Sequence, residues 1–140
     1  MSSDYLITIY ELTSFQKEKL KELENDLIEM RMWEVDQQAN VLPVEPKAFE
    51  FPKTQKYVKA SNEWHDKPEV KEFNDELNVK WSVLKKKYSV NGEPIFSAFI
   101  KSFCWINGNG VSIDCSLDID TFVDWMEDAL GIKEMGVKEQ

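Results

Sequence analysis

The sequence of 140 residues is poor in histidine, arginine, cysteine, glycine and proline. His65 is the only histidine, so a single imidazole is available as a general base. Arg31 is the only arginine, and the forked guanidinium that reads guanine edges and clamps phosphates is therefore almost missing. This scarcity argues against a sequence-specific DNA reader and against histidine-rich metal or catalytic sites.

No apolar run approaches the ~20 residues that cross a bilayer, and the first residues lack the basic start and apolar centre of a signal peptide. We therefore expect a soluble, cytoplasmic protein with no membrane partner. In that compartment Cys104 and Cys115 should stay reduced and serve as small apolar residues. A redox pair, and catalysis by a cysteine together with His65, are the alternatives left open.

The formal net charge of −9 is unevenly distributed. Residues 11–36 carry eight acids and four bases, residues 111–140 carry eight and two, and residues 47–101 carry eleven lysines and eight acids. Because affinity for nucleic acid comes largely from neutralising phosphates, we expect no direct nucleic-acid binding. Acidic ends favour a protein partner that offers a basic surface.

The proportion of apolar residues, 42%, is that of a globular chain, and the length is common for one domain. We expect a single domain over residues 1–140, with a helical insertion over residues 40–92 and a loose tail over residues 132–140. The insertion begins in NVLPVEPKAFEFPK, residues 40–53, where three prolines separate apolar residues. That pattern is typical of an extended crossover that packs along the body of the domain.

Periodicity predicts the remaining elements. Residues 4–12 alternate as in a strand, and apolar residues three and four apart predict a helix over about 14–33, with Thr13 and Gln16 at the spacing of a capping box. Residues 54–66 favour a short helix, and residues 67–88 a longer one. A last helix is expected to begin near Asp120 and to end at Gly131.

The stretch SFCWINGNGVSIDCSLDID, residues 102–120, predicts a β-hairpin around its Asn-Gly-Asn-Gly turn. With residues 107–110 as the turn and Ile106 opposite Val111, the predicted core face consists of Ser102, Cys104, Ile106, Val111, Ile113, Cys115 and Leu117. The reverse face then holds Phe99, Lys101, Phe103 and Trp105 beside Ser112, Asp114 and Ser116. This aromatic row is either a protein-binding patch or the contact surface of helix 67–88.

The order strand, helix, helical insertion, strand, strand, helix predicts an α+β fold, with helices packed on a small antiparallel or mixed sheet. The aspartates near the last helix could ligate a divalent metal. However, an EF-hand loop starting at Asp118 fails, because Phe122 and Val123 stand where an oxygen ligand and a glycine are needed. Asp118 or Asp120 is instead expected to cap the helix. We therefore assign no catalytic, cofactor or metal site.

Whether the protein is an enzyme stays open, with a non-enzyme favoured. The expected function is binding of another protein as an inhibitor, immunity factor or adaptor, for example an anti-defence protein encoded by a phage or other mobile element. The candidate contact residues are Trp105, Phe103, Asp114, Asp124, Glu127 and Asp128. The alternatives are a metal-dependent enzyme that uses dispersed carboxylates and a structural subunit of a larger assembly.

Overall fold

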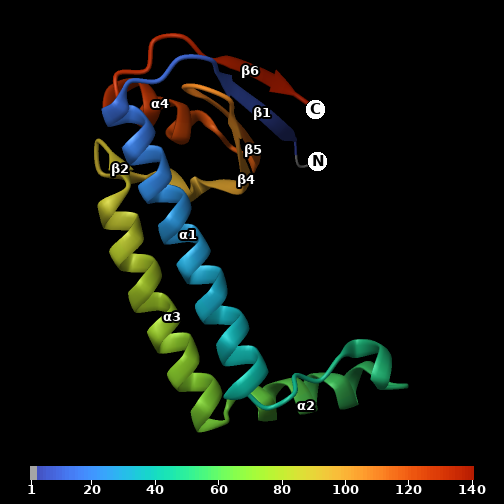
Figure 1. Ribbon diagram of the computed structural model, residues 1–140. Coiled ribbons are helices and arrows are strands. Elements are labelled where there is room, and N and C mark those ends of the chain that lie inside the picture. The colour runs from blue at the N-terminus through green and yellow to red at the C-terminus, as the bar shows by residue number, and fades with distance from the viewer. Residues whose placement is uncertain (1–2) are drawn as a thin grey trace. The chain divides into compact units, whose positions relative to one another are not determined.

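The computed structural model describes residues 3–140, apart from the side chains of Ser97, Ala98 and Leu117. Four α-helices and a four-stranded antiparallel sheet with a small hairpin make this an α+β fold, as the sequence predicted (Figure 1). The elements are β1 (Asp4–Ile9), α1 (Ser14–Asn40), η1 (Ala48–Glu50), α2 (Thr54–His65), α3 (Pro68–Lys87), β2 (Ser89–Val90), β3 (Glu93–Pro94), η2 (Ile95–Ser97), β4 (Ala98–Ile106), β5 (Gly110–Leu117), α4 (Asp120–Asp128) and β6 (Gly136–Glu139).

The chain forms two compact units. The sheet unit comprises the residues up to Asp26 together with Val83–Gln140, and the helical unit comprises Leu27–Ser82. The chain leaves the sheet unit within α1 and returns to it within α3. Whether the whole chain folds as one domain, with an insertion over residues 40–92, stays a prediction.

The sheet has the strand order β4-β5-β1-β6, and each neighbouring pair is antiparallel. Its core face packs against the first turns of α1 and against α4. The fully buried side chains include Ile7, Ile9, Leu20, Leu23, Val111, Ile113, Cys115, Phe122 and Met126. Each large apolar side chain that is fully buried contributes about 1.5–3 kcal/mol, so this cluster stabilises the sheet unit.

The hairpin between β4 and β5 forms where the sequence predicted it, but the predicted register is wrong. Ile106 pairs with Gly110 and not with Val111, so the loop is three residues long, with Gly108 at a φ of +94°. A glycine in this left-handed region is typical of three-residue hairpin loops. Gly110 must therefore be part of the strand, where a Cβ atom would lie 3.0 Å from the carbonyl oxygen of Ile9.

A shift of one residue moves the β4 side chains from Ser102 to Ile106 to the other face of the sheet. Trp105 and Phe103 consequently lie opposite Val111 and Ile113 on the core face, whereas Cys104 is exposed opposite Ser112. The predictions that Ser102, Cys104 and Ile106 belong to the core are thus wrong, while those for Val111, Ile113 and Cys115 are confirmed. Leu117 lies outside the described side chains.

A bulge between Ile100 and Ser102 shifts the pairing by one residue. At the start of β4 the side chains therefore point to the faces that the sequence predicted. Ile100 therefore lies opposite Cys115 on the core side, although Phe103 also faces the core. The extra residue is Lys101, whose Nζ lies 2.9 Å from Oδ2 of Asp4 in β1. This hydrogen bond to Asp4 raises the pKa of the Lys101 ammonium group.

The capping box predicted at the start of α1 is confirmed. The backbone N–H of Gln16 donates to Oγ1 of Thr13 over 3.2 Å, and the backbone N–H of Thr13 donates to Oε1 of Gln16 over 2.9 Å. The side-chain Nε2 of Gln16 also donates to the carbonyl oxygen of Leu130 over 2.9 Å. This third bond joins the start of α1 to the segment that follows α4.

Strand β1 ends at Ile9 and helix α4 at Asp128, a few residues before the predicted ends at residues 12 and 131. Two larger differences concern α1 and the C-terminal residues. Helix α1 continues to Asn40 and does not end near residue 33. Residues 136–139, predicted as part of a loose tail, form strand β6 beside β1, and the backbone N–H of Gln140 donates to the carbonyl oxygen of Asp4 over 2.7 Å. A four-residue strand carries too little apolar alternation to be found from sequence.

In the helical unit, the second half of α1 packs on α3. The rings of Trp33 and Phe73 stack with their centroids 5.2 Å apart, and the Nζ of Lys80 lies 5.0 Å from the centroid of the Trp33 ring. The buried apolar residues of this unit are Leu27, Met30, Val70 and Phe73, and α2 contains no buried residue. The helical unit therefore has a small core compared with the sheet unit.

Candidate functional site

Two of the predicted contact residues, Trp105 and Phe103, lie together on the core face of β4. Their rings are stacked with centroids 6.5 Å apart, and both side chains are half-buried. The indole N–H of Trp105 donates to Oε1 of Glu24 over 3.0 Å, and the Nζ of Lys21 lies 5.4 Å from the centroid of its ring. Two residues of α1 thus contact the Trp105 ring, whereas one of the two alternatives from the sequence placed helix 67–88 against it.

Asp114 lies on the opposite face of the sheet from Trp105, because it stands between Ile113 and Cys115, which are both in the core. Its Oδ1 atom is buried and has no hydrogen-bond partner among the described residues. Burial, and secondarily the charge of Asp114, raises the pKa of the Cys115 thiol to about 11. The thiol of Cys115 is therefore neutral and unreactive at neutral pH.

The remaining predicted contact residues, Asp124, Glu127 and Asp128, are exposed along one side of α4. The other side of this helix buries Phe122, Trp125 and Met126. The three acids of α4 face solvent, whereas the indole of Trp105 in β4 faces α1. The acids and Trp105 therefore belong to separate surfaces. Their role in binding a partner stays a prediction.

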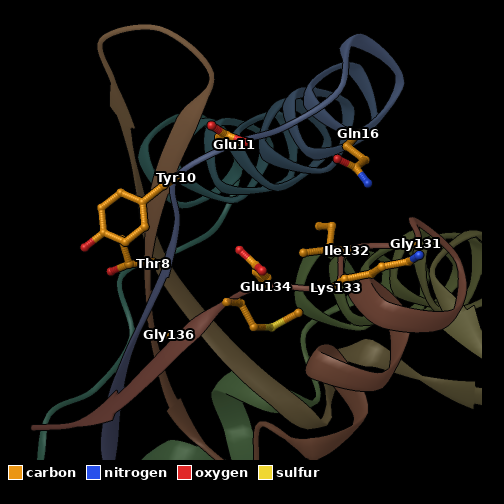
Figure 2. Close-up of a pocket in the computed structure, with 10 residues that line it drawn as sticks. Thr8, Tyr10, Glu11, Gln16, Gly131, Ile132, Lys133, Glu134 and Gly136 are labelled. Carbon is orange, nitrogen blue, oxygen red and sulfur yellow. The ribbon is translucent and has the colours of Figure 1, made fainter.

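An open cleft of about 710 Å³ lies at the edge of the sheet unit. Figure 2 shows that its walls come from the end of β1, the start of α1 and the connection from α4 to β6. The lining residues are Thr8, Tyr10, Glu11, Gln16, Gly131, Ile132, Lys133, Glu134, Met135 and Gly136. No hydrogen bond joins a nucleophile to a base among these residues, all of which the structure describes, so the cleft has polar walls without a catalytic pair.

The other candidate chemistries receive little geometric support. Cys104 and Cys115 are both free thiols and lie on opposite faces of the sheet. His65 is exposed, and its Nδ1 lies 2.7 Å from the carbonyl oxygen of Ser61 within α2. Within residues 3–140, no three histidine, cysteine, aspartate or glutamate side chains gather closely enough to hold a metal ion.

The most unusual surface was not predicted from the sequence. The helical unit exposes a series of apolar side chains, namely Ile28, Met32, Val35, Val41, Val44, Phe49, Val58 and Val79. Those on α1, at positions 28, 32 and 35, follow the spacing of one helix face. Phe49 belongs to the proline-containing crossover over residues 40–53. This crossover was expected to pack along the body of the domain, but its Phe49 side chain is exposed. Alternation of proline and apolar residues predicts an extended chain, but it does not tell whether the side chains are covered.

Comparison with known proteins finds no family model, no curated protein and no solved structure that matches this chain. None of the helices within residues 3–140 is both long enough and apolar enough to cross a lipid bilayer.

Proposed function

We propose that this protein acts by binding another protein, and that the helical unit supplies the contact surface. One observation carries the proposal: the helical unit exposes more large apolar side chains than it buries. Contiguous apolar surface is uncommon on proteins that work alone, because each exposed apolar group costs free energy in water. A partner that covers these side chains would recover that free energy.

The best-defined part of this surface is the α1 stripe, consisting of Ile28, Met32 and Val35. Met32 and Val35 are 67% and 63% exposed. The stripe lies on the opposite side of α1 from Leu27 and Met30, which are buried in the helical unit. Side chains spaced by four and three residues on one helix face are the usual contacts of a helix that docks in a groove.

Methionine suits such a surface because its flexible thioether adapts to irregular partners. Fully burying a side chain of this size contributes about 1.5–3 kcal/mol, so covering the exposed parts of these three side chains favours association with a partner. The small size and the absence of an assembled catalytic pair in the described cleft support a binding role such as that of an inhibitor, immunity factor or adaptor.

The proposal is tested with a charge-matched pair of variants. Met32→Glu with Val35→Glu makes the net charge of the chain more negative by two, and Lys71→Glu does the same at an exposed position on α3. The immobilised wild-type chain and the Lys71 variant should retain one protein in stoichiometric amount from cells that produce the chain. The stripe variant should lose it while keeping the helical content of the wild type.

Equal retention by the stripe variant would overturn the proposed surface. If no protein is retained in stoichiometric amount by the wild-type chain, the proposed function is wrong. Self-association of the purified chain at micromolar concentration, abolished by the stripe substitutions, would instead identify a subunit of a larger assembly.

A further inference from the structure

The crossover between α1 and α2 contains a loop that is fixed at both ends. The indole N–H of Trp64 donates to the carbonyl oxygen of Pro43 over 2.9 Å at one end. At the other end, the rings of Phe51 and Tyr57 are in contact, with centroids 5.9 Å apart. Trp64 and Tyr57 both belong to α2, so this helix contacts the segment at both of its ends. We call residues 43–51 the Phe49 loop.

Within the Phe49 loop, the single turn η1 sets the direction of the chain. The backbone N–H of Glu50 donates to the carbonyl oxygen of Lys47 over 3.0 Å, and that of Phe51 donates to Ala48 over 3.2 Å. Pro43 and Pro46 restrict the backbone further, because the proline ring fixes φ. The loop is therefore ordered by its own contacts before any partner binds.

This ordered loop presents apolar side chains to solvent. Phe49 is 84% exposed and Val44 is 89% exposed. An exposed aromatic ring on an ordered loop is a favourable binding group, since it offers a large apolar area and loses little conformational entropy on binding. Phenylalanine has no polar atom that water could satisfy, so solvation alone does not explain a ring exposed at this position.

The charge around the loop differs from that of the whole chain. Residues 43–61 contain Lys47, Lys53, Lys56 and Lys59 against Glu45 and Glu50, in a protein with a net charge of −9. All four lysines are exposed, and none of them forms an ion pair within residues 3–140. Helix α2, which carries Lys56 and Lys59, lies against η1, so lysines belong both to the segment with the exposed ring and to the helix beside it.

We propose that Phe49 is the anchor of the protein interface and enters an apolar pocket, rimmed by carboxylates, on the partner protein. The inference rests on the proposed function and adds the chemistry of the partner. A buried aromatic anchor supplies most of the affinity of such an interface, and complementary charges at the rim raise the rate of encounter.

Two other occupants fit less well. Single-stranded nucleic acid stacks on aromatic rings, but its affinity depends on phosphate neutralisation, which four lysines in an acidic chain supply poorly. A second copy would bring two chains with a net charge of −9 each together, and a net charge far from zero keeps proteins monomeric.

Photo-crosslinking tests the inference. A photoreactive benzoyl-phenylalanine is placed at position 49 of the full chain, and in separate samples at position 32 and at position 83. Val83 is an exposed valine of the sheet unit and should give no crosslink to the partner. Position 49 should crosslink to the protein that the immobilised wild-type chain retains. The crosslinked peptide of that partner should be rich in aspartate and glutamate. Crosslinks from position 32 but not from position 49 would overturn the Phe49 inference and leave the proposed function intact. A lack of protein crosslinks from both positions would overturn both.

Affinity for the purified partner gives the quantitative measure. Phe49→Ala should weaken binding at least ~30-fold, as expected for an aromatic hot spot, and mainly by faster dissociation. Val83→Ala, the control, changes an exposed valine of the sheet unit and should alter the affinity less than ~3-fold, in the range of energetically neutral contacts. Lys53→Glu with Lys56→Glu should slow association and reduce its dependence on salt. Unchanged affinity of Phe49→Ala, a self-crosslinked dimer or a nucleic-acid crosslink would each contradict the inference.

Discussion

The hydroxyl group of Tyr88 donates a hydrogen bond of 2.6 Å to Oδ2 of Asp26, and Lys87 contacts the same oxygen over 2.8 Å. The Nζ of Lys87 also lies 2.9 Å from Oε1 of Glu22. These bonds join the end of α3 to α1 inside the sheet unit. The ring of Tyr88 is buried between Phe96 and Trp125, so the hydroxyl bond to Asp26 is made at the border of the core.

Tyr88→Phe should therefore destabilise the protein at neutral pH. It removes one hydrogen bond to a charged group and leaves the ring packing in place, which costs about 1.5 kcal/mol of unfolding free energy. Chemical denaturation measures this difference. Tyr10→Phe is the matched control, because Tyr10 is 76% exposed and should tolerate the change. An equal loss in both variants would refute the role of the Asp26 bond.

The same bond predicts how stability depends on alkaline pH. Burial, together with the hydrogen bond to Asp26, raises the pKa of the Tyr88 hydroxyl well above the usual range for tyrosine. A raised native pKa gives stability that is complete below the ordinary tyrosine pKa and is lost as the pH rises through the native value. The difference in stability between wild type and Tyr88→Phe should therefore shrink above pH ~10. A difference that stays constant up to strongly alkaline pH would contradict this.

Thiol labelling should distinguish the two cysteines. Cys104 is exposed and should react with a maleimide in the native protein, whereas Cys115 is buried with its pKa raised to about 11 and should react only after unfolding. Mass spectrometry of the labelled protein should show one modified site, and none in Cys104→Ser. Labelling of both sites under native conditions, or a bond between the two sulfurs, would show that the hairpin register is different.

The start of α4 should depend on Asp118 more than on Asp120. The backbone N–H of Asp120 donates to Oδ1 of Asp118 over 3.1 Å, whereas the N-cap residue is Ile119, whose side chain makes no capping bond. Asp118→Ala should cost about 1 kcal/mol, as the loss of a capping carboxylate does. Asp120→Ala removes a charge near the helix N-terminus and should cost about 0.5 kcal/mol. Thermal unfolding compares the two, and the reverse order would contradict the assignment.

Trp105 should contribute to stability through α1. Trp105→Phe loses the bond to Glu24 and should cost about 1 kcal/mol. Trp105→Ala also loses the half-buried ring and should cost about 2–3 kcal/mol, somewhat less than a fully buried tryptophan. Phe99→Ala serves as the control, because Phe99 is exposed. Wild-type stability of Trp105→Ala, combined with weaker partner binding, would show that the ring is a binding residue.

The exposed acids of α4 provide a test of the contact that the sequence suggested. Asp124→Lys with Asp128→Lys should leave the fold unchanged, since both side chains face solvent. If α4 forms part of the rim of the interface, association with the partner slows in a salt-dependent way. Surface plasmon resonance at two salt concentrations measures this, and an unchanged association rate would remove α4 from the interface.

The elements that could be predicted from the sequence are those whose signal is local. Thr13 and Gln16 specify the start of α1 because their side chains bond to each other's backbone within one turn. The apolar spacing of residues 67–88 predicts α3, which runs over Pro68–Lys87. The α+β class follows from the order of such elements, because each must bury its apolar face against another.

Which side chains are covered depends on contacts between residues far apart in the chain, and these were not predictable from local patterns. The hairpin register includes the close passage of Gly110 beside Ile9, a contact between strands far apart in sequence. This register places Trp105 on the core face of the sheet and exposes Cys104. Strand β6 exists because β1 offers it backbone partners. The exposure of Phe49 likewise follows from where Trp64 and Tyr57 hold its loop. Burial is a property of long-range packing, and a periodic pattern fixes which residues share a face without fixing what lies against it.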